Sequence, residues 1–444
     1  MDLLHSEIKR TFLKFLVPSI GGALVVTLYS FVDTIAIGQG VGPDGTAACA
    51  VLLPIFAIAT FAGLLCGVGG SVLMSRAKGG GSEEKGNAYY TAALLLVGLL
   101  AILIWAGTYL FQEEIYRLFG ANDTLLPYAM EYGTLIILTM PSFVLTSFLA
   151  NFLRNDGVPG FVMTATVIGA AVNIFGDWFF VFPLGMGMFG AALATALGSV
   201  LQVVIMASYL FTKRCGLKLV RPYQLLPAWR KILLNGFGTG FSEIALIIVT
   251  FVANNQIMRY SDTAGLAMYG MLSTIAALFI HIYAGAGQAA QPIASVNYGA
   301  GLVRRYWDVY RLGLRTILIL GVSFTVLCLL LPEEITRLFI KVTPEVLEIA
   351  PMTFRLYALS FLPLGINIFL SVYLQSILRS KAAAVIAVFR GLVLNCILLY
   401  LLPVFWEAAG IWVSFSVTEG LVSVFGLLYV LRIKDAEREE KSIS

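Results

Sequence analysis

Long apolar runs separated by short polar segments make up almost the whole chain. A helix needs roughly 20 apolar residues to cross about 30 Å of hydrocarbon. Of the 444 residues, 59% are apolar and 12% are charged, whereas soluble proteins carry about 25% charged residues. No soluble fold could bury that much apolar surface, so the sequence predicts an all-α integral membrane protein. The twelve expected spans are 12–37, 47–75, 88–111, 126–151, 161–183, 189–212, 232–258, 264–294, 309–331, 346–376, 381–404 and 409–431.

Basic residues are distributed unevenly between the two sides of these spans. If both termini are cytoplasmic, 23 of the 29 basic residues fall in cytoplasmic segments. The outer segments then hold four, which are Arg117, Arg259, Arg337 and Lys341. The positive-inside rule therefore predicts a multi-pass protein of the cytoplasmic (inner) membrane with both termini in the cytoplasm. The same asymmetry explains the net charge of +4 without a nucleic-acid partner.

The N-terminal apolar run and the cysteines bear on processing and on cofactors. The first run continues to about Ile37, which is too long for a signal-peptide core, and it lacks a cleavage pattern. We therefore expect it to be a retained span. The five cysteines have no paired spacing, which indicates small hydrophobic side chains with neither a disulfide framework nor a metal site. No cofactor is expected apart from a coupling ion.

The two halves of the chain resemble each other at a nearly constant offset. The block EEIYRLF at 113–119 aligns with EEITRLF at 333–339, and Asn173 aligns with Asn395 at a slightly larger offset. Six spans per half is an even number, so both copies enter the membrane from the same side and the repeat is parallel. We expect an N-terminal lobe at 1–212, a cytoplasmic linker at 213–231, and a C-terminal lobe with a cytoplasmic tail at 232–444.

This architecture favours a transporter over a channel or an intramembrane enzyme. The chain has two histidines, His5 and His281, and it contains no metal-ligand spacing, nucleophile elbow or phosphate-binding loop. It is therefore not expected to be an enzyme. Without a nucleotide-binding segment, the energy for transport must come from an ion gradient.

Three segments resemble the multidrug and toxic compound extrusion (MATE) family. They are FLVPSIGGALVVTLYSFVDTIAIG at 15–38, GVGGSVLMSRAKGGG at 67–81 and GAGQAAQPIASVNYGAG at 285–301. The third segment is the most specific, and the likeness is closer to bacterial DNA-damage-inducible and staphylococcal-type exporters than to eukaryotic members. The resemblance implies two six-helix lobes that form a V around a central cleft, and export of drugs or toxic compounds coupled to Na⁺ or H⁺.

In the first half, Asp33 and Asp177 are the ionisable residues placed deep in the spans. At about 1.5 Å per residue, Asp33 lies roughly 7 Å and Asp177 roughly 9 Å below the outer ends of their spans, and Thr195 reaches about the same depth. Asn173 lies one turn from Asp177 on the same helix face. Four oxygen-bearing side chains from three helices are thus expected in one depth zone, without a basic partner in their half.

Two neighbouring carboxylates in a low dielectric cannot both stay ionised and unpaired. Either one carboxylate takes a proton or the two share a cation, and carboxylate, amide and hydroxyl oxygens suit a hard ion such as Na⁺. The resemblance implies the same residues, Asp33, Asn173, Asp177 and Thr195, as a Na⁺ or H⁺ coupling site. The alternative is that Asp33 only bonds locally near its helix end and that Asn173 only ties helices together.

The second half has a different charge pattern, with two acids and two bases near mid-membrane. These residues are Glu243, Arg355, Arg390 and Glu419, and equal numbers of opposite charges are typical of a buried structural network. Some branches of the family use a glutamate of span seven in a second-lobe cation site, so Glu243 is a candidate for substrate or ion contact; a salt bridge to an arginine is its alternative. His281 is expected to be a packing residue.

The sequence therefore predicts an antiporter that exports apolar, cationic compounds across the cytoplasmic membrane by alternating access. Small organic cations and the lipid bilayer are its expected partners, and the transporter is expected to be a monomer. The alternative function is a flippase for a lipid-linked saccharide. A flippase should have a more basic cleft, whereas the deep charges of the first half are acids. The choice between Na⁺ and H⁺ stays open from the sequence.

Overall fold

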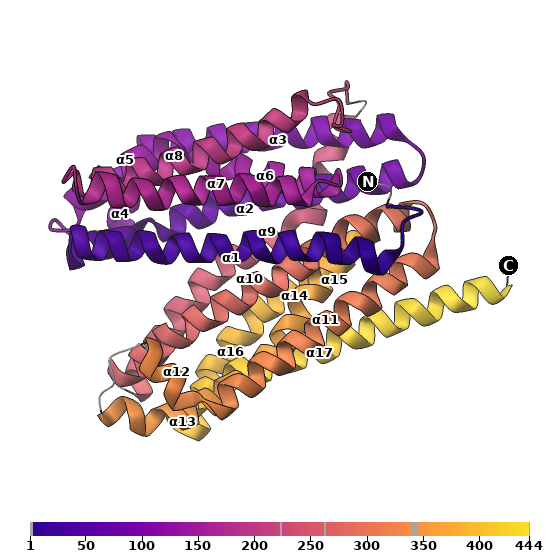
Figure 1. The fold of residues 1–444 in the computed structure, drawn as a ribbon. Helices are drawn as coiled ribbons and strands as arrows, with labels where there is room; N and C mark the ends of the chain where they lie inside the picture. The colour runs from indigo at the N-terminus through magenta and orange to yellow at the C-terminus, as the bar shows by residue number, and fades with distance from the viewer. Residues whose placement is uncertain (1–2, 223, 262, 340–343, 444) are drawn as a thin grey trace. The chain divides into compact units, whose positions relative to one another are not determined.

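The computed structural model describes residues 3–222, 224–261, 263–339 and 344–443, and all regular structure within these ranges is helical (Figure 1). The helices of the first half are α1 (Ile8–Gly40), α2 (Pro43–Gly79), α3 (Glu83–Leu110), α4 (Gln112–Leu118), α5 (Leu126–Leu138), α6 (Met140–Asn155), α7 (Pro159–Gly176), the π-helix η1 (Asp177–Val181), α8 (Gly187–Ser208) and the 3₁₀ turn η2 (Tyr209–Phe211). The helices of the second half are α9 (Leu225–Tyr260), α10 (Thr263–Gly299), α11 (Val303–Leu330), α12 (Pro332–Phe339), α13 (Pro344–Ala358), α14 (Phe361–Ser376), α15 (Ser380–Val388), the π-helix η3 (Phe389–Val393), α16 (Leu394–Leu401) and α17 (Pro403–Ile443). Lys341, one of the four basic residues expected in the outer segments, is not among the residues that the structure describes.

The helices agree in number with the predicted spans. Among the described residues, eleven helical segments are long and apolar enough to cross a membrane, and a twelfth is reached if α5 and α6 form one span bent by 50°. The prediction of a twelve-helix membrane protein is therefore confirmed in its fold class.

Prolines occur both in the first turn of a helix that follows a break and inside continuous helices. Pro141 lies at the start of α6, just after the bend, and Pro363 lies in the first turn of α14. A first-turn proline breaks no hydrogen bond, because its missing N–H would have no intrahelical acceptor. Pro18, Pro54 and Pro292 instead lie inside α1, α2 and α10, which continue past them.

Close contacts divide the described chain into two units. Unit 1 holds residues 1–244, 288–309 and 376–378, and unit 2 holds residues 245–287, 310–375 and 379–444. The boundaries cut α9 and α10 within their lengths, because the first part of α9 and the last part of α10 pack against α2. The predicted boundaries of the lobes at 212 and 232 stay a prediction.

Glycines allow α2 and α9 to cross at backbone contact within unit 1. A Cβ on Gly236 of α9 would lie 1.9 Å from the carbonyl oxygen of Leu65, and one on Gly69 of α2 would lie 2.1 Å from that of Ile232. One turn further along α9, a Cβ on Gly240 would meet the ring of Phe61 at 2.9 Å. Small residues four apart are the usual means of bringing membrane helices this close. The two helices therefore pack backbone against backbone over about two turns.

The segment with the strongest family likeness anchors the start of the chain. At the end of α10, Asn297 donates from Nδ2 to the carbonyl of Leu3 (3.1 Å), and its Oδ1 accepts from Arg305 Nε (2.8 Å). Arg305 also donates from Nη2 to the carbonyl of Ser6 (2.7 Å). Because Asn297 is fully buried, these bonds hold the segment before α1 against the turn between α10 and α11.

The segment expected to be a linker is fastened to unit 1 through Asp156. This carboxylate accepts from the hydroxyl of Tyr209 (2.8 Å) and from the backbone N–H of Gly216 (2.9 Å). Lys78 lies 3.8 Å from Asp156 and donates to the carbonyl of Gly216 (2.6 Å). Burial, as the largest cause, raises the pKa of the neighbouring Cys215 thiol, and the charge of Asp156 adds to this rise.

The rest of this segment follows α3. The backbone N–H of Lys218 donates to Asn87 Oδ1 (3.2 Å), and that of Val220 donates to Thr91 Oγ1 (3.1 Å). The indole of Trp229, in the first turns of α9, donates to the carbonyl of Ala92 (2.8 Å). Residues 218–220 therefore lie against the start of α3 and form a strap that hydrogen bonds hold in place.

Candidate functional site

A chain of hydrogen bonds connects three of the four residues that the sequence singled out. Asn173 of α7 donates from Nδ2 to Thr195 Oγ1 of α8 (3.1 Å), and Thr195 donates to Asp33 Oδ1 of α1 (3.4 Å). Asn173 is buried, while Asp33 and Thr195 are half-buried. Three helices thus meet at one polar point because α7 packs on both α1 and α8.

Asp177 lies next to this chain without being bonded into it. Its backbone N–H donates to the carbonyl of Asn173, so the two side chains lie one α-helical turn apart on the same face. The Asp177 side chain is fully buried, and it lies close enough to Asp33 for their charges to interact. Neither of its carboxylate oxygens accepts a hydrogen bond from the part of the chain that the structure describes.

Aromatic residues explain why Asp177 points inward. Phe175, Trp178 and Phe179 are exposed on the other faces of the same segment, with ring centroids 5.8 Å apart for Phe175 and each of the other two. Such rings are favourable against lipid and at the membrane interface. The π-helical turn of η1 begins at Asp177 itself, and single π-turns are often found at functional positions.

Three further groups surround the carboxylates and were not singled out from the sequence. The phenol of Tyr132 on α5 is buried and interacts with Thr195 and with both aspartates. Tyr29, one turn before Asp33 on α1, and Cys49 of α2 also lie within electrostatic range of Asp33. No basic side chain is among the groups that interact with Asp33 or Asp177 in the described residues.

The amide oxygen of Asn173, like the carboxylate oxygens of Asp177, accepts no hydrogen bond from the described residues. It is buried, and no donor from the described residues reaches it. Unbonded buried oxygens are costly in an apolar surrounding, and here three of them, from two residues, are found one turn apart. These atoms are hard oxygen ligands, which can take up a proton at a carboxylate or contact a cation such as Na⁺.

The charges of the second half only partly form the expected network. In unit 2, Arg390 donates from Nε to Glu419 Oε1 (2.7 Å), and Asn367 donates to Glu419 Oε2 (2.7 Å). Both charged side chains are nearly buried, at 14% and 10% exposed. Arg355 is exposed instead and has no ion pair among the described residues.

Glu243 and His281 remain outside that ion pair. Glu243, on the unit 1 part of α9, is half-buried and has no hydrogen bond or ion pair with the residues that the structure describes. The salt bridge to an arginine, which was one of the two alternatives for Glu243, is therefore not found within unit 1. The other alternative, contact with substrate or ion, stays a prediction. His281 is half-buried and interacts with the backbone of Ala277, one turn earlier in α10, in keeping with a packing residue.

Comparison with known proteins identifies the family. The MatE family model matches residues 18–179 and again 239–401. One match therefore falls on each half of the chain. The two matched ranges start and end at corresponding points of the repeat that pairs EEIYRLF with EEITRLF and Asn173 with Asn395.

Relatives of known name match along nearly the whole chain. The multidrug export protein MepA of Staphylococcus saprophyticus is 23% identical over 98% of this chain and 96% of its own length. MepA of Staphylococcus aureus strain MSSA476 is 24% identical over 97% and 95%. Crystal structures of MATE in the straight and the bent conformation, 22% and 23% identical, superpose with TM-scores of 0.91 and 0.89 over 98% and 100% of this chain and 98% of theirs. The chain therefore belongs to the MatE family and has the twelve-helix fold that its resemblance to the extrusion transporters implied.

Proposed function

We propose that this protein is a cation-coupled antiporter that exports structurally varied apolar organic cations. Membership of the MatE family supports a transporter, and the names of the MepA relatives support multidrug export. Entry of Na⁺ or H⁺ at the site of Asp33, Asn173, Asp177 and Thr195 drives outward release of substrate by alternating access between two states. No other cofactor takes part in this proposal.

One observation carries the proposed coupling site. Both carboxylate oxygens of Asp177 and the amide oxygen of Asn173 are buried without a donor in the described structure. A charge deep in a membrane costs about 2.5 to 3.5 kcal/mol on insertion scales. A proton or a cation removes that cost, and binding of either is then coupled to the packing of α1, α7 and α8 around the site.

The acids at the site also bear on the alternative function. A flippase for a lipid-linked saccharide must bind a pyrophosphate, which requires basic side chains. The titratable groups that interact with Asp33 in the described structure are Asp177, Tyr29, Tyr132 and Cys49. These groups fit a cation and not a phosphate, so no observation favours the flippase.

The proposed orientation places both termini in the cytoplasm of the cell that makes the protein. Export of a cation then works against the inward potential, which contributes about 2.3 kcal/mol per charge per 100 mV. A reporter that fluoresces only in the cytoplasm, fused after the C-terminus, should be fluorescent. Light scattering of the purified protein in detergent should give the mass of a monomer.

Efflux of a fluorescent organic cation from reconstituted vesicles tests the coupling site. Na⁺ and H⁺ gradients are imposed separately, and the gradient that drives efflux by the wild-type protein identifies the ion. Asp177→Asn should abolish gradient-driven efflux while the protein remains folded by circular dichroism. Asp123→Asn is the matched control, because Asp123 is 90% exposed and pairs with Arg117. Gradient-driven efflux by Asp177→Asn at the wild-type rate would refute the site.

A further inference from the structure

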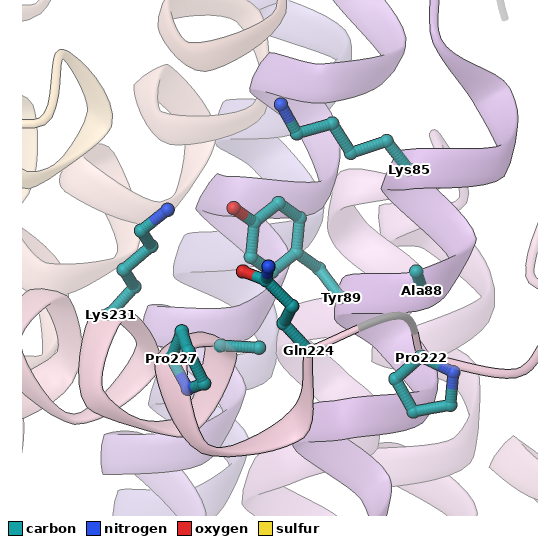
Figure 2. Close-up of a pocket in the computed structure, with 8 residues that line it drawn as sticks. Lys85, Ala88, Tyr89, Pro222, Gln224, Pro227 and Lys231 are labelled. Carbon is teal, nitrogen blue, oxygen red and sulfur yellow. The ribbon is translucent and has the colours of Figure 1, made fainter.

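A cavity lies between the start of α3 and the segment that leads into α9, away from the acidic site. Its volume is about 300 Å³, and Lys85, Ala88 and Tyr89 of α3 line one side. Gln224, Pro227 and Lys231 line the other side, together with Pro222 and Ala228. Figure 2 shows the polar ends of Lys85, Tyr89, Gln224 and Lys231 in the space between the two segments. All of these residues belong to unit 1.

The two lysines of this cavity, Lys85 and Lys231, are both exposed. Neither forms an ion pair with the residues that the structure describes. The carboxylates nearest in sequence do not line the cavity. Glu83 lies 3.6 Å from Lys78, which also holds Asp156, and Glu84 is exposed in the first turn of α3. The cavity therefore combines two ammonium groups with no acid in its lining.

The remaining lining adds neutral hydrogen-bonding groups and a fixed frame. The Tyr89 hydroxyl and the Gln224 amide can each donate a hydrogen bond, and both face the same space as the lysines. The strap contacts of Lys218 and Val220 hold the linker against α3, and the indole of Trp229 fixes the start of α9. The site is thus held in place by bonds that do not involve its own polar side chains.

A ligand with several acceptor oxygens and negative charge fits this set of groups. Two ammonium ions, a phenol and an amide can together bind a phosphate group, for which lysine is a common partner as a point charge. The cavity lies at the starts of two candidate spans, Glu83–Leu110 and Leu225–Tyr260, and we infer that it lies at headgroup depth because a spanning helix leaves the hydrocarbon near its ends. Basic pockets between membrane helices at that depth are suited to anionic lipid headgroups.

We propose that this cavity binds the phosphate group of an anionic phospholipid headgroup, with Lys85 and Lys231 as the paired cations. Free inorganic phosphate offers the same chemistry without the acyl chains, so the test contains one arm for each source. A bound lipid would fasten α3 to the start of α9 from the membrane side. The binding is separate from drug export and does not depend on the acidic site.

Native mass spectrometry of the full-length protein in detergent measures the binding directly. The protein is titrated with phosphatidylglycerol, with phosphatidylcholine and with inorganic phosphate. Phosphatidylglycerol should bind with higher affinity than phosphatidylcholine, and the double variant Lys85→Gln and Lys231→Gln should weaken phosphatidylglycerol binding by about 30-fold, since one lysine near an anionic surface contributes about a fivefold factor. The double variant Lys85→Arg and Lys231→Arg should retain binding.

A matched control removes the same charge from the same region. Lys213 and Lys218 are exposed, lie in the segment between η2 and α9, and do not line the cavity. Lys213→Gln with Lys218→Gln should leave phosphatidylglycerol binding within about twofold of the wild type. Equal losses in the two double variants, or equal affinity for both lipids, would overturn the proposal. Binding of inorganic phosphate at millimolar concentration, without preferential binding of phosphatidylglycerol, would assign the site to the free anion and overturn the lipid proposal.

Discussion

Gly236 lies where α9 crosses α2, and replacing it with alanine tests the backbone packing of unit 1. The added Cβ would lie 1.9 Å from the carbonyl oxygen and 2.7 Å from the carbonyl carbon of Leu65, whereas ordinary contacts begin at 3.4 Å. Backbone atoms of a helix cannot turn aside as a side chain can. The two helices must therefore move apart at this point until the distance from the Cβ to the carbonyl oxygen grows from 1.9 Å to 3.4 Å.

The energetic consequence follows from that separation. A gap of 0.5 to 1 Å already loses about a quarter to a half of a dispersion contact, and the neighbouring contacts of Gly69 and Gly240 along the same crossing are affected too. Overpacking typically costs about 1 to 3 kcal/mol, while alanine in place of a helical glycine restores about 0.5 to 1 kcal/mol. We expect Gly236→Ala to lower the free energy of unfolding by about 2 kcal/mol, near the upper end of that balance because the obstacle is backbone.

Thermal unfolding in detergent, followed by intrinsic fluorescence, measures this effect. A loss of that size should lower Tm by about 4 °C, at roughly 2 °C per kcal/mol for a large chain. Gly98→Ala and Gly107→Ala on α3 are the controls, because no atom lies within 4 Å of their added Cβ, and they should match or slightly exceed the wild-type Tm. If Gly236→Ala unfolds at the same temperature as these controls, α2 and α9 do not cross in backbone contact and the packing argument is wrong.

Three other outcomes follow from contacts already described. Thr195→Val removes both hydrogen bonds of the polar chain at nearly constant volume, so we expect the free energy of unfolding to fall by about 1 kcal/mol in the same assay and ion-driven efflux to weaken. Thr195→Ser should retain the stability and the efflux of the wild type. A valine variant with wild-type efflux would contradict the role of the hydroxyl. Arg390→Gln leaves the buried Glu419 carboxylate without its cation and should lower the free energy of unfolding by about 3 to 5 kcal/mol. Arg337→Gln, which breaks an exposed pair, should change it by less than about 1 kcal/mol. Similar effects of the two variants would show that the pair of Arg390 and Glu419 is not buried. The pKa of the Cys215 thiol is raised, so less thiolate is present at neutral pH. In a variant with the other four cysteines replaced, maleimide should label Cys215 more slowly than a free thiol, and the labelling should accelerate as the pH rises. Labelling as fast as that of a free thiol at pH 7 would contradict this.

The spans and the repeat could be predicted because each rests on a local pattern. Apolar length alone located the helices, and the internal repeat was recovered by the two family matches. The convergence of Asp33, Asn173 and Thr195 was also accessible, since depth in a straight helix can be counted at about 1.5 Å per residue. The counting succeeded there because α1, α7 and α8 are unbroken at these positions.

Where the face of a helix matters, or where contacts join distant segments, counting residues along the chain was not enough. The count gave Arg355 a depth but not a helix face, and its side chain is exposed. Tyr132 was missed because one phenol among 19 tyrosines has no distinguishing signal in the sequence. Gly236 and Gly240 have the spacing of a close helix crossing, yet nothing in the sequence names α2 as the partner. The cavity of Lys85 and Lys231 forms only because the strap brings residues from two distant segments together.

The two π-helical turns lie at different points of the repeated halves. In the alignment that pairs Asn173 with Asn395, Asp177 corresponds to Leu399, which is also fully buried. The π-turn at Phe389–Val393 corresponds to 167–171, where the first copy is α-helical. A π-turn holds one residue more than an α-turn, so it turns the side chains that follow it onto a new face. In the first copy the π-turn begins at Asp177, and in the second it includes Arg390, which pairs with Glu419. The place of the π-turn along the repeated helix therefore differs between the two copies, together with the charged residue that the turn carries.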